Sequence, residues 1–364
     1  MKPAFPSTAH SARQRGVTLI EIMLALVLGL LVVAGLLQLF LGSKVSYNLQ
    51  EGLGRLQEDG RLAMELIAAD IRMAGQNGCR RDLDLTDNSG LNAFLSDLSV
   101  PIQGFDAAGT GLGSSYSITA TDPAASSTAA DWLPNLDANL LGDVIPGTDV
   151  VVTRYVDALA FPLTADSSNT VFTALGHTFV AGTSPILVAA DCQQGSIFQP
   201  TAVDDAAGTI THAAWMSPEG LNEEQTRIGA LRTVAYFICQ SASGSPALCR
   251  SRVLPNTGVW SGTEELVEGI ENMQLLYGRD TSGDGAVDDF VAANTVGTGN
   301  WGQVVSVRLS LLVRTVDEVT RDTDTQTYDL VSRLAAQRVR VDPVDDNRMR
   351  KVFSTTLSLR NRLP

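Results

Sequence analysis

The sequence predicts an α+β protein in which one long N-terminal helix packs on a β-rich globular domain. Three observations lead to this fold class. Residues 17–42 are apolar apart from one carboxylate, and residues 43–78 place apolar side chains at helical spacing. Residues 79–364 contain short runs rich in β-branched and aromatic side chains, separated by loops rich in Gly, Ser, Thr and Asp. The first two segments favour one helix with an apolar half and an amphipathic half, and the third favours sheets.

The segment from Val17 to Gly42 is long enough to cross a membrane. Its 26 residues reach about 39 Å as a helix, whereas a bilayer core is about 30 Å thick. A secretory signal peptide is the alternative, but its apolar region runs for only about 7 to 15 residues, and no A-x-A cleavage pattern follows here. Lys2, Arg13 and Arg15 precede the span without an acidic neighbour. Because basic flanks favour the cytoplasmic side, we expect the rest of the chain to lie outside.

Glu21 is the one charged residue within this span. A carboxylate inside a bilayer costs about 2.5 to 3.5 kcal/mol on insertion scales, so it needs either water or a partner. One interpretation places Glu21 close enough to the cytoplasmic face to reach water. The other follows from its neighbours, which read Gly-Val-Thr-Leu-Ile-Glu from Gly16 and lead directly into the apolar span.

This motif resembles the class III signal of type IV prepilins and pseudopilins. The resemblance implies that a membrane-embedded prepilin peptidase cuts between Gly16 and Val17 and methylates the new amine of Val17. Residues 1–16 are then the leader, and Glu21 is the assembly carboxylate. A cationic amine on the same or a neighbouring subunit pairs with Glu21, which offsets the cost of burying the acid. Major pilins often carry Phe where this chain has Val17, whereas minor subunits vary there.

The chain is acidic, with a formal net charge of −14. Removal of the leader takes away three basic and no acidic residues, so the charge becomes −17. This excess argues against general nucleic-acid binding, which needs a basic surface. One basic cluster lies near the C-terminus, and we interpret it as the solvated face of a strand. Its members are Arg338, Arg340, Arg348, Arg350, Lys351, Arg360 and Arg362.

Four cysteines follow the span, in the part of the chain expected in an oxidising compartment where disulfides form. Cys239 ends a strand-like run and Cys249 follows a turn-rich stretch. Two antiparallel strands bring these two together, so Cys239–Cys249 is the predicted pair. Cys79–Cys192 follows by elimination. A zinc site is the alternative, but no C-x-x-C occurs and only two histidines follow the leader.

Residues 43–78 continue the helix beyond the span. No proline occurs between Pro6 and Pro101, and Gly75 and Gly78 provide a stop. Three further glycines weaken the helix by up to about 1 kcal/mol each and indicate a bend. They are Gly52, Gly54 and Gly60. The apolar stripe consists of Val45, Leu49, Leu53, Leu56, Ala63, Ile67, Ile71 and Ala74.

The globular part, residues 79–364, reads as β-rich. Residues 86–148 are loop-like in composition, and residues 304–314 alternate apolar and polar side chains, which predicts a strand with one solvated face. The predicted strands are 149–156, 186–190, 231–239, 270–277, 303–314 and 351–360.

One loop carries the pattern of a calcium site. Asp280, Ser282, Asp284 and Asp288 occupy the first, third, fifth and ninth positions of an EF-hand-like loop, and a glycine stands at the sixth. The closing acid at the twelfth position is absent, and Asp289 is a substitute for it. Related filament proteins use calcium loops. The alternative is an acidic turn between strands, because Asp and Gly are turn residues.

The whole chain resembles PilW-type minor pilins in its signal, its length, its Asp/Gly loop and its ending DDNRMRKVFSTTLSLRNRLP. The resemblance implies a pilin-like, noncatalytic subunit of the type IV pilus that helps to start pilus assembly in a tip or priming complex and supports twitching motility and adhesion. Its implied partners are the prepilin peptidase, other minor pilins, a tip adhesin, the major pilin and the inner membrane. It is expected as a single-pass inner-membrane protein with a periplasmic C-terminal domain, and later in the pilus at the cell surface.

Alternative functions remain open from sequence. A J-type pseudopilin of type II secretion is similar to PilW proteins, and the long polar loops also fit a tip adhesin. A membrane-anchored periplasmic enzyme needs a catalytic cluster, but neither G-x-S-x-G nor H-E-x-x-H occurs. A G-x-G-x-x-G pattern spans residues 297–302, yet it precedes a predicted strand rather than a helix, so no organic cofactor is expected.

Overall fold

The computed structural model describes residues 16–78, 83–118, 128–157, 161–166, 170–173, 179, 186–212, 225–254, 259–297, 299–332 and 336–362. The chain divides into two compact units, Met1–Glu51 and Gly52–Pro364. The first unit holds the start of one long helix, and the second holds the end of that helix together with all the described strands. The predicted α+β class with a long N-terminal helix is therefore confirmed.

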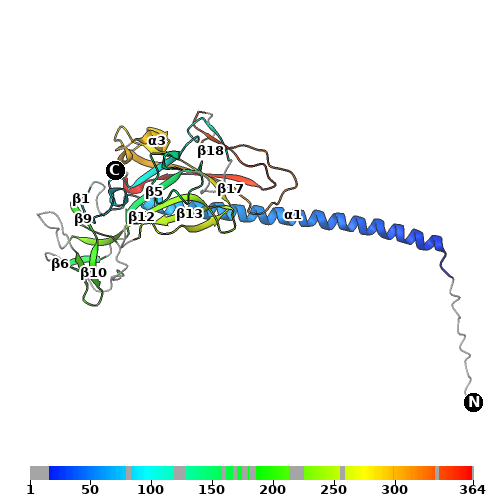
Figure 1. Ribbon diagram of the computed structural model, residues 1–364, viewed down its shortest axis with the longest axis horizontal. Coiled ribbons are helices and arrows are strands. Elements are labelled where there is room, and N and C mark those ends of the chain that lie inside the picture. Colours follow the sequence, from blue (N-terminus) through cyan, green and yellow to red (C-terminus); the bar gives the residue numbers. More distant parts are fainter. Residues whose placement is uncertain are drawn as a thin grey trace, which may run out of the picture. The chain divides into compact units, whose positions relative to one another are not determined.

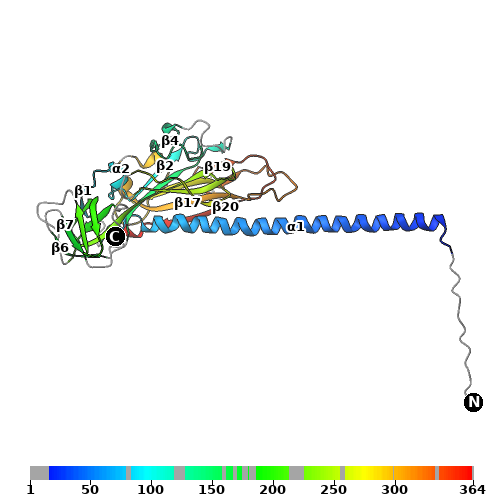
Figure 2. The same ribbon diagram turned by 60° about the horizontal axis from the view of Figure 1, so that its bottom comes forward.

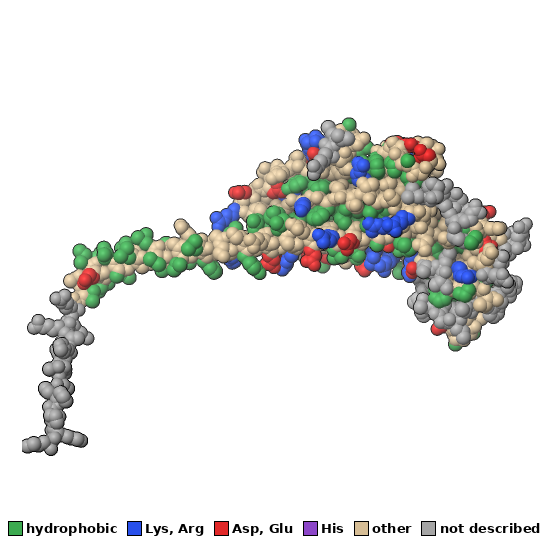
Figure 3. Space-filling view, turned by 180° about the vertical axis from the view of Figure 1, so that it is seen from behind, with side chains coloured by type: hydrophobic (Ala, Val, Ile, Leu, Met, Phe, Trp, Pro, Cys, Tyr) green, Lys and Arg blue, Asp and Glu red, His purple; other side chains and the backbone are tan. Residues whose placement is uncertain are grey.

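Helix α1 (Leu19–Met73) is continuous over 55 residues (Figure 1). Its first part is long and apolar enough to cross a membrane. Apolar side chains from Val17 to Leu41 are exposed, and green side chains line this part of the helix on the face that Figure 3 shows. A helix that is apolar on every side needs a lipid or protein environment around it.

The second part of α1 is amphipathic, as its spacing predicts. Its buried stripe packs into the main core with side chains of several strands, among them Tyr236, Leu309 and Leu357. Gly60 permits close approach, because a Cβ there would lie 2.5 Å from a ring carbon of Phe353. The helix ends before Gly75, whose φ of +77° belongs to the left-handed region. The buried residues of α1 are Leu56, Gly60, Ala63, Ile67, Ala68 and Ile71.

One sheet that packs on the second part of α1 is antiparallel, with the strand order β16-β15-β17-β20. Its members are β15 (Ile270–Arg279), β16 (Asp289–Val291), β17 (Val304–Arg314) and β20 (Arg350–Ser358). Figure 2 shows β17 and β20 side by side along the second part of α1. The register runs without a shift from Ser306↔Ser358 to Arg314↔Arg350.

The alternation in residues 304–314 predicts one solvated face, and this expectation is wrong. Ser306 and Ser310 of β17 are 4% and 0% exposed. A small sheet of β3 (Ser115–Ser117), β18 (Tyr328–Leu330) and β19 (Val339–Asp342) supplies apolar side chains that pack with Leu312 on this face. Two of the four polar positions of β17 are therefore serines that form hydrogen bonds inside the core, whereas Arg308 and Arg314 remain half-buried.

The largest sheet contains thirteen strands within the described residues, and β12 is its longest strand. β12 pairs with four neighbours along its 14 residues, which explains its nearly unbroken burial. The members are β1 (Asp84–Asn88), β2 (Ile102–Ala107), β4 (Trp132–Leu133), β5 (Val150–Val156), β6 (Phe161–Asp166), β7 (Thr170–Thr173), β8 (Leu187–Ala190), β9 (Gln194–Phe198), β10 (Pro200–Asp204), β11 (Thr209–His212), β12 (Arg227–Gln240), β13 (Pro246–Arg252) and β14 (Glu264–Glu268). Two short helices, α2 (Ala93–Ser96) and α3 (Ala293–Val296), complete the fold.

All six predicted strands are present, as β5, β8, β12, β15, β17 and β20. The loop expected over residues 86–148 is wrong in part, because it contains the buried strand β2. In the sequence, Gly104 of β2 interrupts the residue pattern that predicts a strand. The glycine is required because the hydroxyl of Tyr277 occupies the place where a Cβ would stand.

Candidate functional site

The start of α1 is built from the predicted processing motif. The Thr18 N–H donates to Oε2 of Glu21 at 3.0 Å, and the Thr18 hydroxyl donates to the same oxygen at 3.1 Å. The Glu21 N–H donates to Oγ1 of Thr18 at 3.4 Å. These reciprocal bonds form a capping box, which satisfies backbone donors that the first helical turn leaves unpaired. Glu21 therefore has a local structural role in addition to the role predicted from its motif.

The predicted scissile bond lies just outside this helix. Gly16 and Val17 are exposed and not helical, and no atom lies within 4 Å of the place where a Cβ of Gly16 would stand. The predicted scissile bond therefore lies outside the hydrogen-bonded turns of the helix. Oε1 of Glu21 accepts no hydrogen bond within the part of the chain that the structure describes, so it is free to pair with an amine. The rest of the predicted leader lies outside the described residues.

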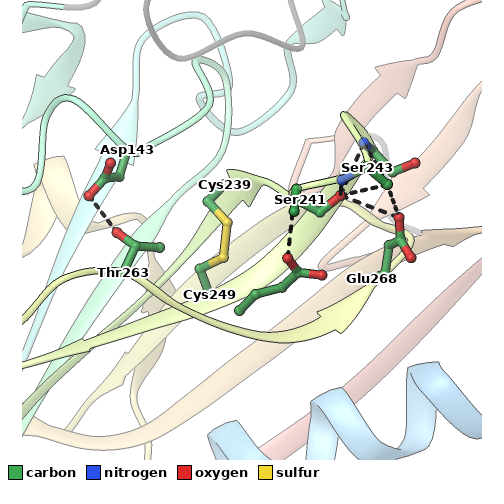
Figure 4. The surroundings of a disulfide bond; sticks show 10 residues. Asp143, Cys239, Ser241, Ser243, Cys249, Thr263 and Glu268 are labelled. Atoms are coloured by element: carbon green, nitrogen blue, oxygen red, sulfur yellow. Dashed lines mark hydrogen bonds between the residues drawn. A yellow bond between two sulfur atoms is a disulfide. The ribbon is translucent and has the colours of Figure 1, made fainter.

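A disulfide joins Cys239 on β12 to Cys249 on β13 (Figure 4), which confirms the first predicted pair. The two strands are antiparallel neighbours, and the Cα atoms are 5.8 Å apart. The turn between these strands is held by Glu268 of β14, because Oε1 of Glu268 accepts hydrogen bonds from the hydroxyls of Ser241 and Ser243. The second pair stays a prediction, because Cys79 lies outside the described residues.

The predicted calcium ligands all lie in one turn between β15 and β16. Asp280 accepts hydrogen bonds from the N–H groups of residues 283, 284 and 285, at 2.6, 3.2 and 2.8 Å. Asp288 accepts from the N–H groups of residues 281 and 282 at 2.7 and 2.9 Å. Asp284 accepts from the N–H of residue 286 at 2.8 Å. The pKa of Asp280 is lowered, chiefly by the N–H of Gly285, and the pKa of Asp288 is lowered, chiefly by the hydroxyl of Thr281.

Asp289, suggested as the substitute for the missing acid at the twelfth position, forms an ion pair with a residue outside the loop. Oδ2 of Asp289 pairs with Nη2 of Arg279 at 2.6 Å, which lowers the pKa of Asp289. Among the described residues, no three acidic, histidine or cysteine side chains are arranged to hold a metal ion. Asp280 and Asp288 therefore find their partners within the turn itself, and calcium binding stays a prediction that Ser282, Asp280, Asp284 and Asp288 would carry.

A buried ion-pair network surrounds Arg350, one member of the basic cluster. Its side chain is 0% exposed and that of Glu271 on β15 is 1% exposed. Nε and Nη2 of Arg350 donate to the two carboxylate oxygens of Glu271 at 2.7 and 3.1 Å. Nη1 and Nη2 also donate to the two carboxylate oxygens of Asp346 at 2.7 and 3.1 Å. The network therefore ties the start of β20 to β15, across β17.

The expected solvated face of this cluster is wrong for Arg350, whereas the other members are half-exposed or exposed. Arg350 is buried, and Arg338 and Arg340 both pair with Asp329 at 2.9 and 3.1 Å. Lys351 and Arg360 are exposed, as expected. One signal for the network was present in the sequence, because Glu271 stands inside the otherwise apolar or neutral run IENMQLLY. A charge in a buried strand has to find a partner.

A second buried cluster contains two carboxyl groups that no sequence motif marks. The carboxylate of Asp149, 3% exposed, accepts hydrogen bonds from the N–H groups of Ala107 and Leu275 at 3.0 and 2.8 Å, so it joins β2 to β15. Asp106 accepts from Nδ2 of Asn294 at 2.8 Å. Burial raises the pKa of Asp106 to about 6, and burial together with Asp106 raises the pKa of Asp149 well above its usual range.

Two family models match the chain. Residues 11–37 match the prokaryotic N-terminal methylation motif, and residues 235–361 match the type IV pilus-assembly protein W family. The first match covers Gly16, Val17 and Glu21, and the second covers the Arg350 network and the sheet of β15, β16, β17 and β20. No curated protein and no solved structure gives a match. Together the matches support a pilin-like role related to the type IV pilus.

Proposed function

We propose that this chain, whose two family matches support a PilW-type pilin, is a noncatalytic minor subunit that helps to initiate type IV pilus assembly. In this role it joins other minor pilins and a tip adhesin in a priming complex, on which the major pilin then polymerises. The pilus that results supports twitching motility and adhesion. A pilin-family assignment implies a structural protein, which agrees with a role in assembly rather than in catalysis.

One observation carries the proposal. The apolar, exposed part of α1 begins with a capping box formed by Thr18 and Glu21, directly after the Gly16–Val17 bond. Cleavage at that bond by the prepilin peptidase produces an amine on Val17, four residues before Glu21. The new amine of one subunit and the unoccupied Oε1 of another have opposite charges, so they attract each other in an apolar filament core. No separate nucleic-acid role is proposed, because the chain is acidic.

The location follows from the same features. Before assembly, residues 17–42 cross the inner membrane once, with the leader in the cytoplasm and residues 79–364 in the periplasm. The Cys239–Cys249 disulfide agrees with an oxidising compartment. After assembly, we expect the subunit in the pilus at the cell surface.

Deletion of the gene, with complementation by the full chain, tests the proposal. We expect the deletion strain to lose surface pili and twitching, and complementation to restore both. Loss of enzyme secretion with a normal number of pili would instead support a J-type pseudopilin. Normal pili with defective attachment alone would support an adhesin. Intact mass of the complemented protein checks processing, because a chain that begins with N-methylated Val17 is expected.

A further inference from the structure

Strand β20 forms an open edge of its sheet, because among the described residues it pairs only with β17. The hydrogen bonds between β20 and β17 show which backbone groups of β20 point away from β17. The Thr315 N–H donates to the Met349 oxygen at 2.9 Å, and the Leu359 N–H donates to the Val305 oxygen at 2.9 Å. In an antiparallel pair, hydrogen-bonded residues alternate with residues whose N–H and C=O groups point away from the partner strand. Odd-numbered residues of β20 therefore bond to β17, and outward groups belong to Val352, Ser354, Thr356 and Ser358.

This edge lacks the features that usually protect an exposed strand. Natural edges are kept short, or they carry bulges, prolines or outward charges. β20 has nine residues, no proline and an uninterrupted register with β17. Lys351 is its one exposed charged residue, and Ser354, Thr356 and Ser358 carry only hydroxyl groups. The edge is therefore available for pairing with another extended segment.

A groove of about 910 Å³ runs beside the edge. One wall is β20 itself, from Arg350 to Thr356, and the other wall is formed by residues 328–332 together with Arg308. At about 3.3 Å per residue, the nine residues of β20 extend over about 30 Å, which is enough for an added strand of similar length.

The groove is lined by cations without a carboxylate partner and by a carboxylate that already has partners. Arg308 and Lys351 line it, and neither forms an ion pair with a carboxylate among the described residues. Asp329 also lines it, but its two oxygens are occupied by Arg338 and Arg340. The groove therefore presents uncompensated positive charge on a chain whose net charge is −14. An acidic segment complements it.

We propose that the open edge of β20 binds an extended, acidic segment of another protein of the filament as an additional β-strand. This inference rests on the proposed function as a filament subunit. Backbone hydrogen bonds to the outward groups of β20 supply affinity, and carboxylates of the partner near Arg308 and Lys351 supply orientation.

A second copy of this chain fits the edge less well. Among the described residues, the edge strands of the globular unit that contain acids, which include β1, β10 and β14, have at most five residues each. The most acidic of them, β14, also has a register irregularity opposite β13. Its carboxylates already have partners, because Glu264 pairs with Arg250 at 2.9 Å and Glu268 accepts hydrogen bonds from two serines. The occupant is therefore a segment of a different protein.

The test combines a photocrosslinking residue at Ser354 with matched changes at Thr356, in the full-length protein in its own cells. Thr356→Pro removes an outward N–H, and proline is tolerated on an edge strand when that N–H faces away from the ladder. Thr356→Val keeps the N–H and serves as the control. We expect a crosslink to an acidic segment of another filament subunit, identified by peptide mass spectrometry. Its yield should fall about five- to tenfold in Thr356→Pro, as the loss of one hydrogen bond predicts, and remain unchanged in Thr356→Val.

A charge test uses two exposed cations of the same region. Lys351→Glu reverses a charge in the groove, whereas Arg360→Glu reverses one that does not line it. We expect the crosslink yield to fall with Lys351→Glu and to stay constant with Arg360→Glu. Equal yields in Thr356→Pro and Thr356→Val, a crosslink to a second copy of this chain, or no crosslink in cells whose sheared filaments contain this subunit would each overturn the inference. Absence of the subunit from filaments would instead overturn the proposed function.

Discussion

Replacement of Arg350 by Met removes the central cation of the buried network and keeps a long side chain in its place. The guanidinium is fully buried and makes four hydrogen bonds to the carboxylates of Glu271 and Asp346, at 2.7 to 3.1 Å. Without it, the one remaining cation beside Glu271 among the described residues is Arg314, whose Nη1 lies 3.3 Å from Oε1 of Glu271. Removal of one partner from a buried ion pair costs about 3 to 5 kcal/mol, because a buried charge is left uncompensated. We expect a loss of this size in the free energy of unfolding.

The measurement is urea unfolding of the full chain in detergent micelles, followed by the fluorescence of the buried tryptophans. The matched control is Arg232→Met, which removes an ion pair with Asp157 at 3.0 Å whose side chains are 43% and 53% exposed. An exposed pair contributes about 1 kcal/mol or less, so this control should change stability little.

A double replacement distinguishes two causes of the lost stability, namely the loss of the ion pair itself and the burial of an unpaired carboxylate. If the cost of Arg350→Met comes from the uncompensated carboxylate, Arg350→Met combined with Glu271→Leu should be more stable than Arg350→Met alone. A loss in Arg350→Met no larger than that of Arg232→Met would refute the reasoning, since it would mean that the network contributes no more than a surface pair.

Four further predictions address other parts of the chain. Because burial raises the pKa of Asp106 to about 6, the folded state keeps a proton that the unfolded state releases near pH 4; the contribution of Asp106 to stability should therefore decrease by about 3 kcal/mol as the pH rises from 4 to 7, which urea titrations measure as a change in the stability difference between the parent and Asp106→Asn. Joint replacement of Cys239 and Cys249 by Ser should lower the free energy of unfolding by about 2.7 kcal/mol, which is the chain-entropy value for a loop of this length. Chemical reduction of the disulfide in the parent protein should lower it by no more than that amount. The Glu21→Val variant should insert into the membrane normally but be poorly recovered in sheared pili. Normal recovery of the variant in sheared pili would count against the assignment of Glu21 as an assembly carboxylate. Millimolar calcium should raise the melting temperature above its value in chelator, because binding adds about 2.7 kcal/mol to the free energy of unfolding when free calcium is 100 times the dissociation constant. Asp284→Ala should abolish this rise. If the melting temperatures are identical and calorimetry shows no binding heat, the loop is only an acidic turn.

Several features could be read from the sequence because they depend on residues close together in the chain. The span and the processing motif are contiguous, and the stripe of α1 follows helical spacing. Cys239 and Cys249 belong to adjacent strands of one hairpin, ten positions apart. In each case the geometry of one helix or one hairpin is sufficient to place the side chains.

Other features were decided only when distant segments packed together. Residues 304–314 look half-solvated until β18 and β19 cover them. Gly104 in β2 looks like a loop residue until the Tyr277 hydroxyl occupies the place of its side chain. The buried acids Asp106 and Asp149 come from segments 43 positions apart, and no local pattern distinguishes them from acids in turns.

The basic C-terminal cluster shows the difference most clearly. From sequence, its arginines and lysines are equivalent, and alternation along β20 says only which ones share a face. The tertiary structure separates them, because Glu271 and Asp346 meet at Arg350, whereas Lys351, the next residue, remains exposed beside an open edge. The sequence by itself determined the long apolar helix, the N-terminal methylation motif and six of the twenty described strands, since these follow from local motifs and periodicity. Which charges are buried in pairs and which remain available to a partner depended on long-range contacts, because desolvation is a property of the packed fold and not of the residue.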